Sequence, residues 1–247
     1  MTSGIILFLV AMVGAALGEA MGQSLRRQLP LLLAFGGAFL LGLCFVHLLP
    51  EAFEANGHAG MWVIGGFLVQ LGLEYLSKGL EHGHVQGNRF STLAFLSLCL
   101  HAFIEAMPFG LEYLSERVHD HHGQGHHGHY HDHAGESGWG LLFGIGLHKL
   151  PVAIALMTIL NTTAMSRMRR WTWATVFAMV PFLGILLSRN LPHDAATFGA
   201  LNGLLVGILL HIATTILFET SEGHEFNSRK FPIVLLGLAL SWMTTHL

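Results

Sequence analysis

Long apolar runs separated by short polar segments dominate this chain. Eight runs are long enough to cross about 30 Å of hydrocarbon at about 1.5 Å per helical residue, and they cover residues 4–22, 31–50, 60–80, 92–115, 139–164, 172–188, 197–219 and 231–247. The run at 172–188 is short and contains Pro181, which is expected to kink it. The pattern predicts an all-α, multi-pass integral membrane protein in which residues 1–247 form a single transmembrane domain.

Composition supports this prediction and narrows the class of protein. Hydrophobic residues make up 52% of the chain and charged residues 11%, whereas soluble domains contain about 25% charged residues. The net charge of −3 is spread thinly, so no nucleic-acid partner is expected. The chain has no GxxxxGK[ST] phosphate loop, which argues against nucleotide hydrolysis. Cys44 and Cys99 both lie inside predicted spans and indicate no disulfide framework.

Positive charge is concentrated in alternate loops. One set of loops contains Arg26, Arg27, Lys78, Arg89, Arg167, Arg169, Arg170, Arg229 and Lys230, and the other set contains Arg117 and Arg189. Because short loops rich in Lys and Arg stay in the cytoplasm, both termini are predicted to be extracytoplasmic. No Lys or Arg precedes the first apolar run, so we interpret that run as a transmembrane helix and not as a cleaved signal peptide.

A polar segment between the fourth and fifth runs is rich in histidine. It reads HDHHGQGHHGHYHDH and holds eight of the eighteen histidines: His119, His121, His122, His126, His127, His129, His131 and His133. Neutral imidazole is the commonest protein ligand for Zn²⁺ and similar cations. The sequence predicts an extracytoplasmic, metal-capturing loop over residues 119–137.

Two of the apolar runs contain ionisable residues near their middle. His101 and Glu105 are four residues apart in the fourth run and therefore share one helical face, and Pro108 follows them. His148 and Lys149 lie in the fifth run. A charge at the bilayer centre costs about 2.5–3.5 kcal/mol on insertion scales, so each such group needs a partner or a function.

Two interpretations of these groups stay open. In one, His101 and His148 make interhelical hydrogen bonds while Glu105 neutralises Lys149. In the other, which we favour because a histidine-rich loop lies beside them, His101, Glu105 and His148 are three ligands of a transported divalent cation.

Further ionisable residues lie nearer the ends of the runs. His47 and Glu51, at the outer end of the second run, are candidate entrance residues, and the alternative is that they are interfacial residues in contact with water. Glu74, His211 and Glu219 are candidates for an exit path, and polar clusters on the inner side would continue this path. The alternative is that these groups and clusters are solvated helix ends. Those clusters contain Lys78, Glu81, His82, His84, Glu222, His224 and Glu225.

Three segments, FGGAFLLGLCFVHLLPEA, HAFIEA and HKLPVA, follow one another along the chain. In that order they resemble the second-helix signature, the fourth-helix HxxxE motif and the fifth-helix motif of the ZIP family, the zinc- and iron-regulated-like metal transporters. The three occur in the family's order, and together with the eight spans the resemblance covers most of the chain. It implies an eight-helix bundle arranged as three, two and three helices, with inverted repeats outside and the metal site on the central pair.

The resemblance also implies roles for individual residues. His101 and Glu105 occupy the positions of the fourth-helix ligands, and His148 that of the fifth-helix histidine. Many members form a two-metal site with a polar residue after the first histidine and a glutamate on the fifth helix; here these positions are Ala102 and Val152. A second intramembrane ion is therefore not expected, and Lys149 would lie near its place, as a lysine does in some members. The position of the long histidine-rich loop also departs from the family. Here the loop lies between the fourth and fifth spans, on the extracytoplasmic side, whereas the family's loop joins spans three and four on the cytoplasmic side.

The sequence thus predicts a secondary transporter that carries Zn²⁺, with Fe²⁺, Mn²⁺ or Cd²⁺ as further cargo, and not an enzyme. Movement toward the cytoplasm is implied by the resemblance alone. The expected partners are divalent metal ions and the lipid bilayer, and a homodimer is compatible with the sequence. The rivals are an intramembrane zinc hydrolase, which leaves one metal position for water, and a membrane metal sensor or binding protein that uses the loop.

Overall fold

The computed structural model describes residues 2–20, 29–77, 92–111, 134–219 and 230–243, and within these ranges every regular element is helical. This confirms the all-α prediction. The elements are α1 (Thr2–Ala20), α3 (Leu29–Leu43), the π-helical turn η1 (Cys44–Leu48), α4 (Leu49–Ala55), α5 (Ala59–Ser77), α6 (Thr92–Ala106), α8 (Ala134–Asn161), α9 (Arg167–Ser188), α10 (Ala195–Glu219) and α11 (Lys230–Met243).

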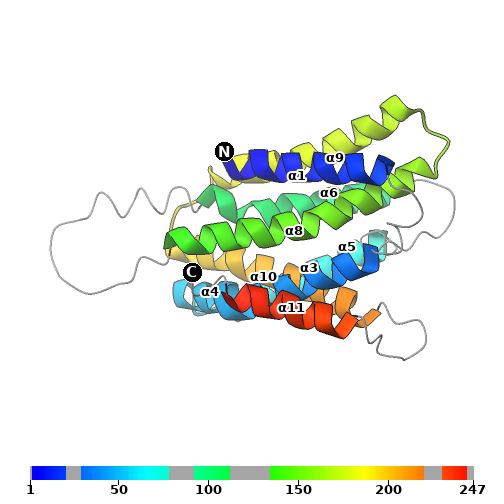
Figure 1. The fold of residues 1–247 in the computed structure, drawn as a ribbon. Helices are drawn as coiled ribbons and strands as arrows, with labels where there is room; N and C mark the ends of the chain where they lie inside the picture. Colours follow the sequence, from blue (N-terminus) through cyan, green and yellow to red (C-terminus); the bar gives the residue numbers. More distant parts are fainter. Residues whose placement is uncertain (1, 21–28, 78–91, 112–133, 220–229, 244–247) are drawn as a thin grey trace.

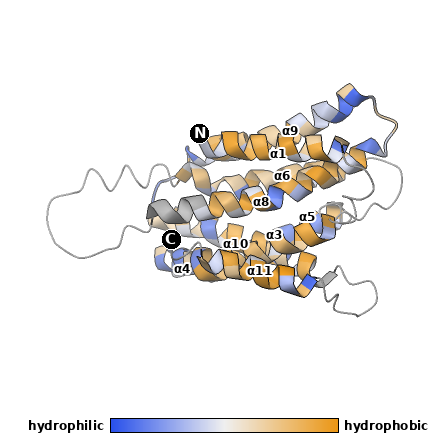
Figure 2. Ribbon diagram, in the orientation of Figure 1, coloured by the Kyte–Doolittle hydropathy of each residue, from blue (hydrophilic) through white to orange (hydrophobic). Residues whose placement is uncertain are grey.

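Seven helical segments of the described chain are long and apolar enough to cross a membrane, and α3, η1 and α4 form one of them, Leu29–Ala55. The eighth apolar helix, α11, is shorter at 14 residues. Figure 2 shows hydrophobic residues along most of each helix and hydrophilic residues gathered toward several helix ends. These features are those of a multi-pass integral membrane protein.

Two helices begin a few residues before the apolar runs that predict them. The sixth run was predicted over 172–188, but α9 begins at Arg167, where the Ser166 side chain caps the helix by accepting a hydrogen bond from the Arg169 backbone N–H. The predicted loop over 119–137 overlaps α8, which begins at Ala134. Both differences have one cause: a helix continues past its apolar run for as long as its backbone can hydrogen-bond, and polar residues do not end it.

The prolines act differently in different helices. α6 ends at Ala106, just before Pro108, and the Met107 N–H bonds to the Ile104 carbonyl over 3.1 Å in a tighter turn. Pro151 and Pro181 lie inside the continuous helices α8 and α9. Within a bundle, neighbouring helices can hold a proline-containing helix together although one backbone hydrogen bond is missing.

The helices pack in two groups (Figure 1). One group contains α1, α6, α8 and α9, and the other contains the α3–α4 segment, α5, α10 and α11. Glycines allow close approach within each group: a Cβ at Gly14 of α1 would lie 2.7 Å from the Leu150 carbonyl oxygen of α8, and one at Gly207 of α10 would lie 2.0 Å from the Val63 carbonyl oxygen of α5. Between the groups, α3 packs on α8 and α5 on α6.

Candidate metal centre

α6 carries His101 and Glu105 on its buried face. That face also contains Ala94, Phe95, Ser97, Leu98, Ala102 and Ala106. The spacing of four residues places the two side chains one above the other, and His101 Nε2 lies 3.7 Å from Glu105 Oε2. The Ser97 hydroxyl, one turn before His101, donates a hydrogen bond of 2.7 Å to the Leu73 carbonyl of α5 and joins the two helix groups there.

α8 supplies the neighbouring residues His148 and Lys149. Successive side chains of a helix diverge by about 100°, and these two reach the α6 pair from different sides. The His148 ring stands edge-on to the His101 ring, with centroids 6.1 Å apart and planes at 88°. Lys149 Nζ lies 3.5 Å from Glu105 Oε2.

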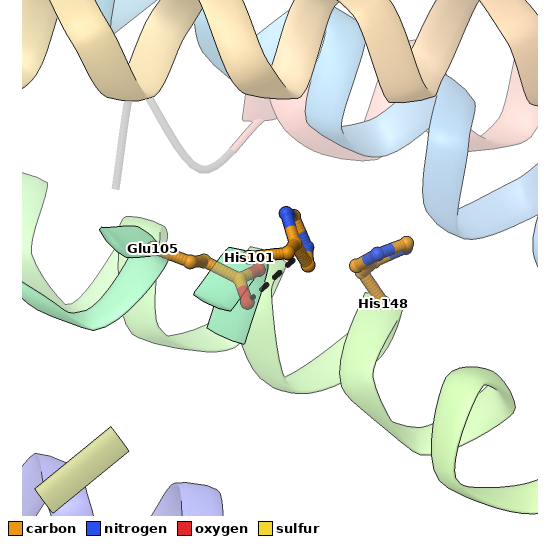
Figure 3. Close-up of side chains that lie close together, drawn as sticks. All are labelled: His101, Glu105 and His148. Atoms are coloured by element: carbon orange, nitrogen blue, oxygen red, sulfur yellow. Dashed lines mark ion pairs between the residues drawn. The ribbon is translucent and has the colours of Figure 1, made fainter. Parts of the chain in front are cut away.

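One ligand atom from each of His101, Glu105 and His148 lies within 4.8 Å of the other two (Figure 3). The three residues are 3%, 1% and 3% exposed. Zn²⁺ binds imidazole nitrogen and carboxylate oxygen at about 2.0–2.2 Å, so tetrahedral coordination places ligand atoms about 3.3–3.5 Å apart. Small side-chain rotations would close the cluster around an ion, and the cluster could therefore bind a metal.

Lys149 is the fourth charged or ionisable member of the cluster, and it is 2% exposed. Its ammonium pairs with Glu105 and also lies over the Phe177 ring of α9, 5.1 Å from the centroid. The interpretation in which Glu105 neutralises Lys149 thus describes a contact that is present. The Glu105 carboxylate thus belongs both to the ion pair with Lys149 and to the cluster with His101 and His148.

The cluster lies where the two helix groups meet. On the α3 side, a Cβ at Gly36 would be 3.7 Å from both the His148 Cα and the Leu147 carbonyl oxygen. On the α9 side, the apolar core contains Val152 and Phe177. Low polarity around the site strengthens every electrostatic interaction within it.

The candidate entrance residues lie at a local irregularity. His47 belongs to the π-helical turn η1, and Glu51 follows in α4; both are partly exposed. Pro50 lies between them and cannot donate the backbone hydrogen bond to the residue four positions earlier. Wide π turns often mark functional sites. Their role as entrance residues stays a prediction.

The structure brings two of the candidate exit residues together. His211 Nε2 of α10 and Glu74 Oε2 of α5 are 2.5 Å apart, and the Phe67 ring packs edge-on against His211 with centroids 4.7 Å apart. Glu219 lies in the last turn of α10, and its side chain is outside the described part. The inner polar clusters and the histidines of 119–133 also lie outside the described residues.

Sequence reasoning missed two features of the structure. Phe177 carried no signal, because it is one of seventeen phenylalanines in an apolar chain. Glu19 of α1 accepts two hydrogen bonds of 3.0 Å from Arg167 and one of 2.8 Å from the Trp171 indole N–H. A carboxylate inside an apolar run was the available signal for Glu19; its partners are far away in the chain.

The described residues thus show a multi-pass helical membrane protein with a buried His–Glu–His cluster that could hold a metal ion. Its function has to be argued from that site, since no protein-family model matches the chain and neither does any curated protein.

Proposed function

We propose that this protein is a secondary transporter of divalent metal cations, with Zn²⁺ as the main cargo and Fe²⁺, Mn²⁺ or Cd²⁺ as further ones. The observation that carries the proposal is the convergence of His101, Glu105 and His148 from two apolar helices. Three metal-ligating side chains in the interior of a membrane protein are costly to bury and so indicate a functional site.

The chemistry of the three ligands suits an ion that must leave again. Two neutral imidazoles and one carboxylate replace part of the ion's hydration shell and supply one negative charge. Conduction and transport need binding that is favourable enough to dehydrate the ion and weak enough to release it. The Lys149 ammonium 3.5 Å from Glu105 works in the same direction, because it competes with the ion for the carboxylate.

The direction and the path complete the proposal. The segments that resemble ZIP motifs support, for this protein, a 3+2+3 arrangement of helices with inverted repeats. They also support extracytoplasmic termini and movement of the ion toward the cytoplasm. The ion is captured by the histidines of 119–133, passes His47 and Glu51, binds the cluster, and leaves on the side of His211, Glu74 and Glu219.

The rival functions make different demands on the same residues. A zinc hydrolase needs a general base besides its three ligands, and Glu105 is the one carboxylate among the buried polar side chains of the described residues. A sensor that used only the histidine-rich loop would not need a buried cluster. Both considerations favour transport.

Uptake of Zn²⁺ into proteoliposomes tests the proposal. Glu105→Gln keeps the size of the side chain but removes the charge, and we expect it to lower uptake at least tenfold, since loss of a charged ligand costs well over about 1.4 kcal/mol. Glu54→Gln is the matched control, because Glu54 is an exposed carboxylate of α4, and its uptake should equal that of the wild type.

Three results would contradict the proposal. Glu105→Gln uptake within about twofold of the wild type, at equal reconstitution, would remove Glu105 from the path. Saturable Zn²⁺ binding without uptake would favour the sensor. Zn²⁺-dependent lipid hydrolysis by the purified protein, lost in Glu105→Gln, would favour the hydrolase.

A further inference from the structure

Among the described residues, groups of two different kinds lie close to the Lys149 ammonium. Its Nζ lies 3.5 Å from Glu105 Oε2 of α6 and 5.1 Å from the centroid of the Phe177 ring of α9. We propose that the Phe177 ring holds the Lys149 charge while a metal ion occupies Glu105, and that Phe177 thereby sets the affinity of the site. This inference rests on the proposed function and assigns a positioning role to a residue that binds no metal.

The need for such a residue follows from the charges. In the metal-free site, Glu105 and Lys149 neutralise each other where both are almost fully buried. A divalent ion at the cluster binds the same carboxylate and repels the ammonium. The ammonium then loses most of its pairing, and a buried charge without a partner is strongly unfavourable.

The Phe177 ring meets this need without competing for the ion. The face of an aromatic ring attracts a cation within about 6 Å of its centroid, and more strongly when the pair is shielded from water. Phe177 is 2% exposed, as is Lys149. A ring is not a ligand for Zn²⁺, so the interaction of the Phe177 ring with Lys149 persists when the ion binds. This interaction then stabilises the ammonium more than the weakened ion pair with Glu105 does.

The alternative is that Phe177 only fills space. It belongs to an apolar core that also contains Phe95, Leu98, Val152 and Met157. In that case replacing Phe177 would affect the site through packing alone, and the effect would not depend on whether residue 149 is charged.

A double-mutant cycle separates the two readings. The Zn²⁺ concentration that gives half-maximal uptake is measured for the full-length wild type, Phe177→Leu, Lys149→Met and the double variant. We expect Phe177→Leu to raise this concentration about fivefold in the wild-type background and to change it less than twofold in the Lys149→Met background.

Two controls make the cycle specific. Phe95→Leu removes a ring from the same core, one that packs edge-on against Trp173 with centroids 4.6 Å apart, and its effect should be the same in both backgrounds. Replacing Phe177 by 3,4,5-trifluorophenylalanine keeps the shape of the ring and weakens its negative face. This variant should also raise the half-maximal concentration, and it covers the case in which Phe177→Leu does not fold.

The outcomes distinguish this inference from the proposed function. If Phe177→Leu changes the half-maximal Zn²⁺ concentration equally in both backgrounds, the role of Phe177 is overturned. The proposed function would stand as long as uptake depends on Glu105. Absence of Glu105-dependent uptake would overturn both. The melting temperatures of the metal-free variants supply a further readout. If the effect of Phe177→Leu on the melting temperature depends on residue 149, but its effect on the half-maximal Zn²⁺ concentration does not, the ring only stabilises the fold. That result would also overturn the proposed role of Phe177.

Discussion

Among the described residues, two histidine–carboxylate pairs lie in different helix groups, and one of them belongs to a cluster of three side chains that could hold a metal ion. On α6, His101 and Glu105 are 3.7 Å apart, with His148 and Lys149 of α8 beside them. Across α5 and α10, Glu74 and His211 are only 2.5 Å apart, and the neighbouring ring is Phe67.

The difference shows what a metal site requires beyond the right residue types. In the α5–α10 pair, the imidazole and the carboxylate satisfy each other directly, and the third position is filled by a ring that cannot bind a metal. In the α6–α8 cluster, the pair is looser and a third ligand converges on it. Three protein ligands are the usual minimum for a zinc site that keeps an open position.

Removing the third ligand is expected to have the largest effect. His148→Ala leaves the cluster with two ligands, like the α5–α10 pair, and should weaken Zn²⁺ binding at least tenfold, or about 1.4 kcal/mol. The change is measured by titrating the purified protein with Zn²⁺. His211→Ala is the control: it should keep the affinity of the cluster within about twofold and lower the melting temperature, since the hydrogen bond between His211 and Glu74 is lost. Equal losses of affinity in the two variants would show that the two pairs do not differ as metal sites.

Adding a third ligand to the other pair is expected to create a site. Phe67→His places an imidazole where a ring already packs 4.7 Å from His211, and Glu74 follows two helical turns later on α5. We expect this variant to bind one more Zn²⁺ per chain than the wild type, measured by elemental analysis after dialysis. An unchanged metal content would mean that the His211–Glu74 bond is too stable to open.

Removing the countercharge is expected to have a moderate effect in the opposite direction. Lys149→Met deletes the cation that competes for Glu105 and should tighten Zn²⁺ binding about fivefold. Lys149→Arg keeps the charge and serves as the control in the same titration. Weaker binding in Lys149→Met would contradict the countercharge role.

Adding Val152→Glu to Lys149→Met should then permit a second intramembrane ion, since a carboxylate would replace an apolar residue of the neighbouring core.

Deleting residues 119–133 is expected to have the smallest effect, because these histidines lie outside every apolar run. Uptake should fall about two- to threefold at scarce Zn²⁺ and stay near the wild-type rate at saturating Zn²⁺. The deletion should also remove weak binding sites that disappear on acidification, since protonated imidazole cannot bind a metal. An equal fall in rate at saturating Zn²⁺ would place the loop in the mechanism of translocation.

Much of the architecture could be predicted from local pattern. Apolar length located the spanning helices, and the spacing of four residues put His101 and Glu105 on one face. The start of α9 at Arg167 and of α8 at Ala134 could not be found in this way, because neither boundary coincides with a change from polar to apolar residues. Helix caps and backbone hydrogen bonds set such boundaries.

Apolar run length and the ionisable residues within the runs were enough to predict a helical membrane protein in which His101, Glu105, His148 and Lys149 are buried and need partners. Which partners these residues have depends on how the helices pack. The fold joined His148 to the α6 pair and placed Phe177 over Lys149, and it closed His211 on Glu74, 137 positions away in the chain. Local periodicity fixes which face a residue occupies on its own helix, whereas helix packing decides which faces meet.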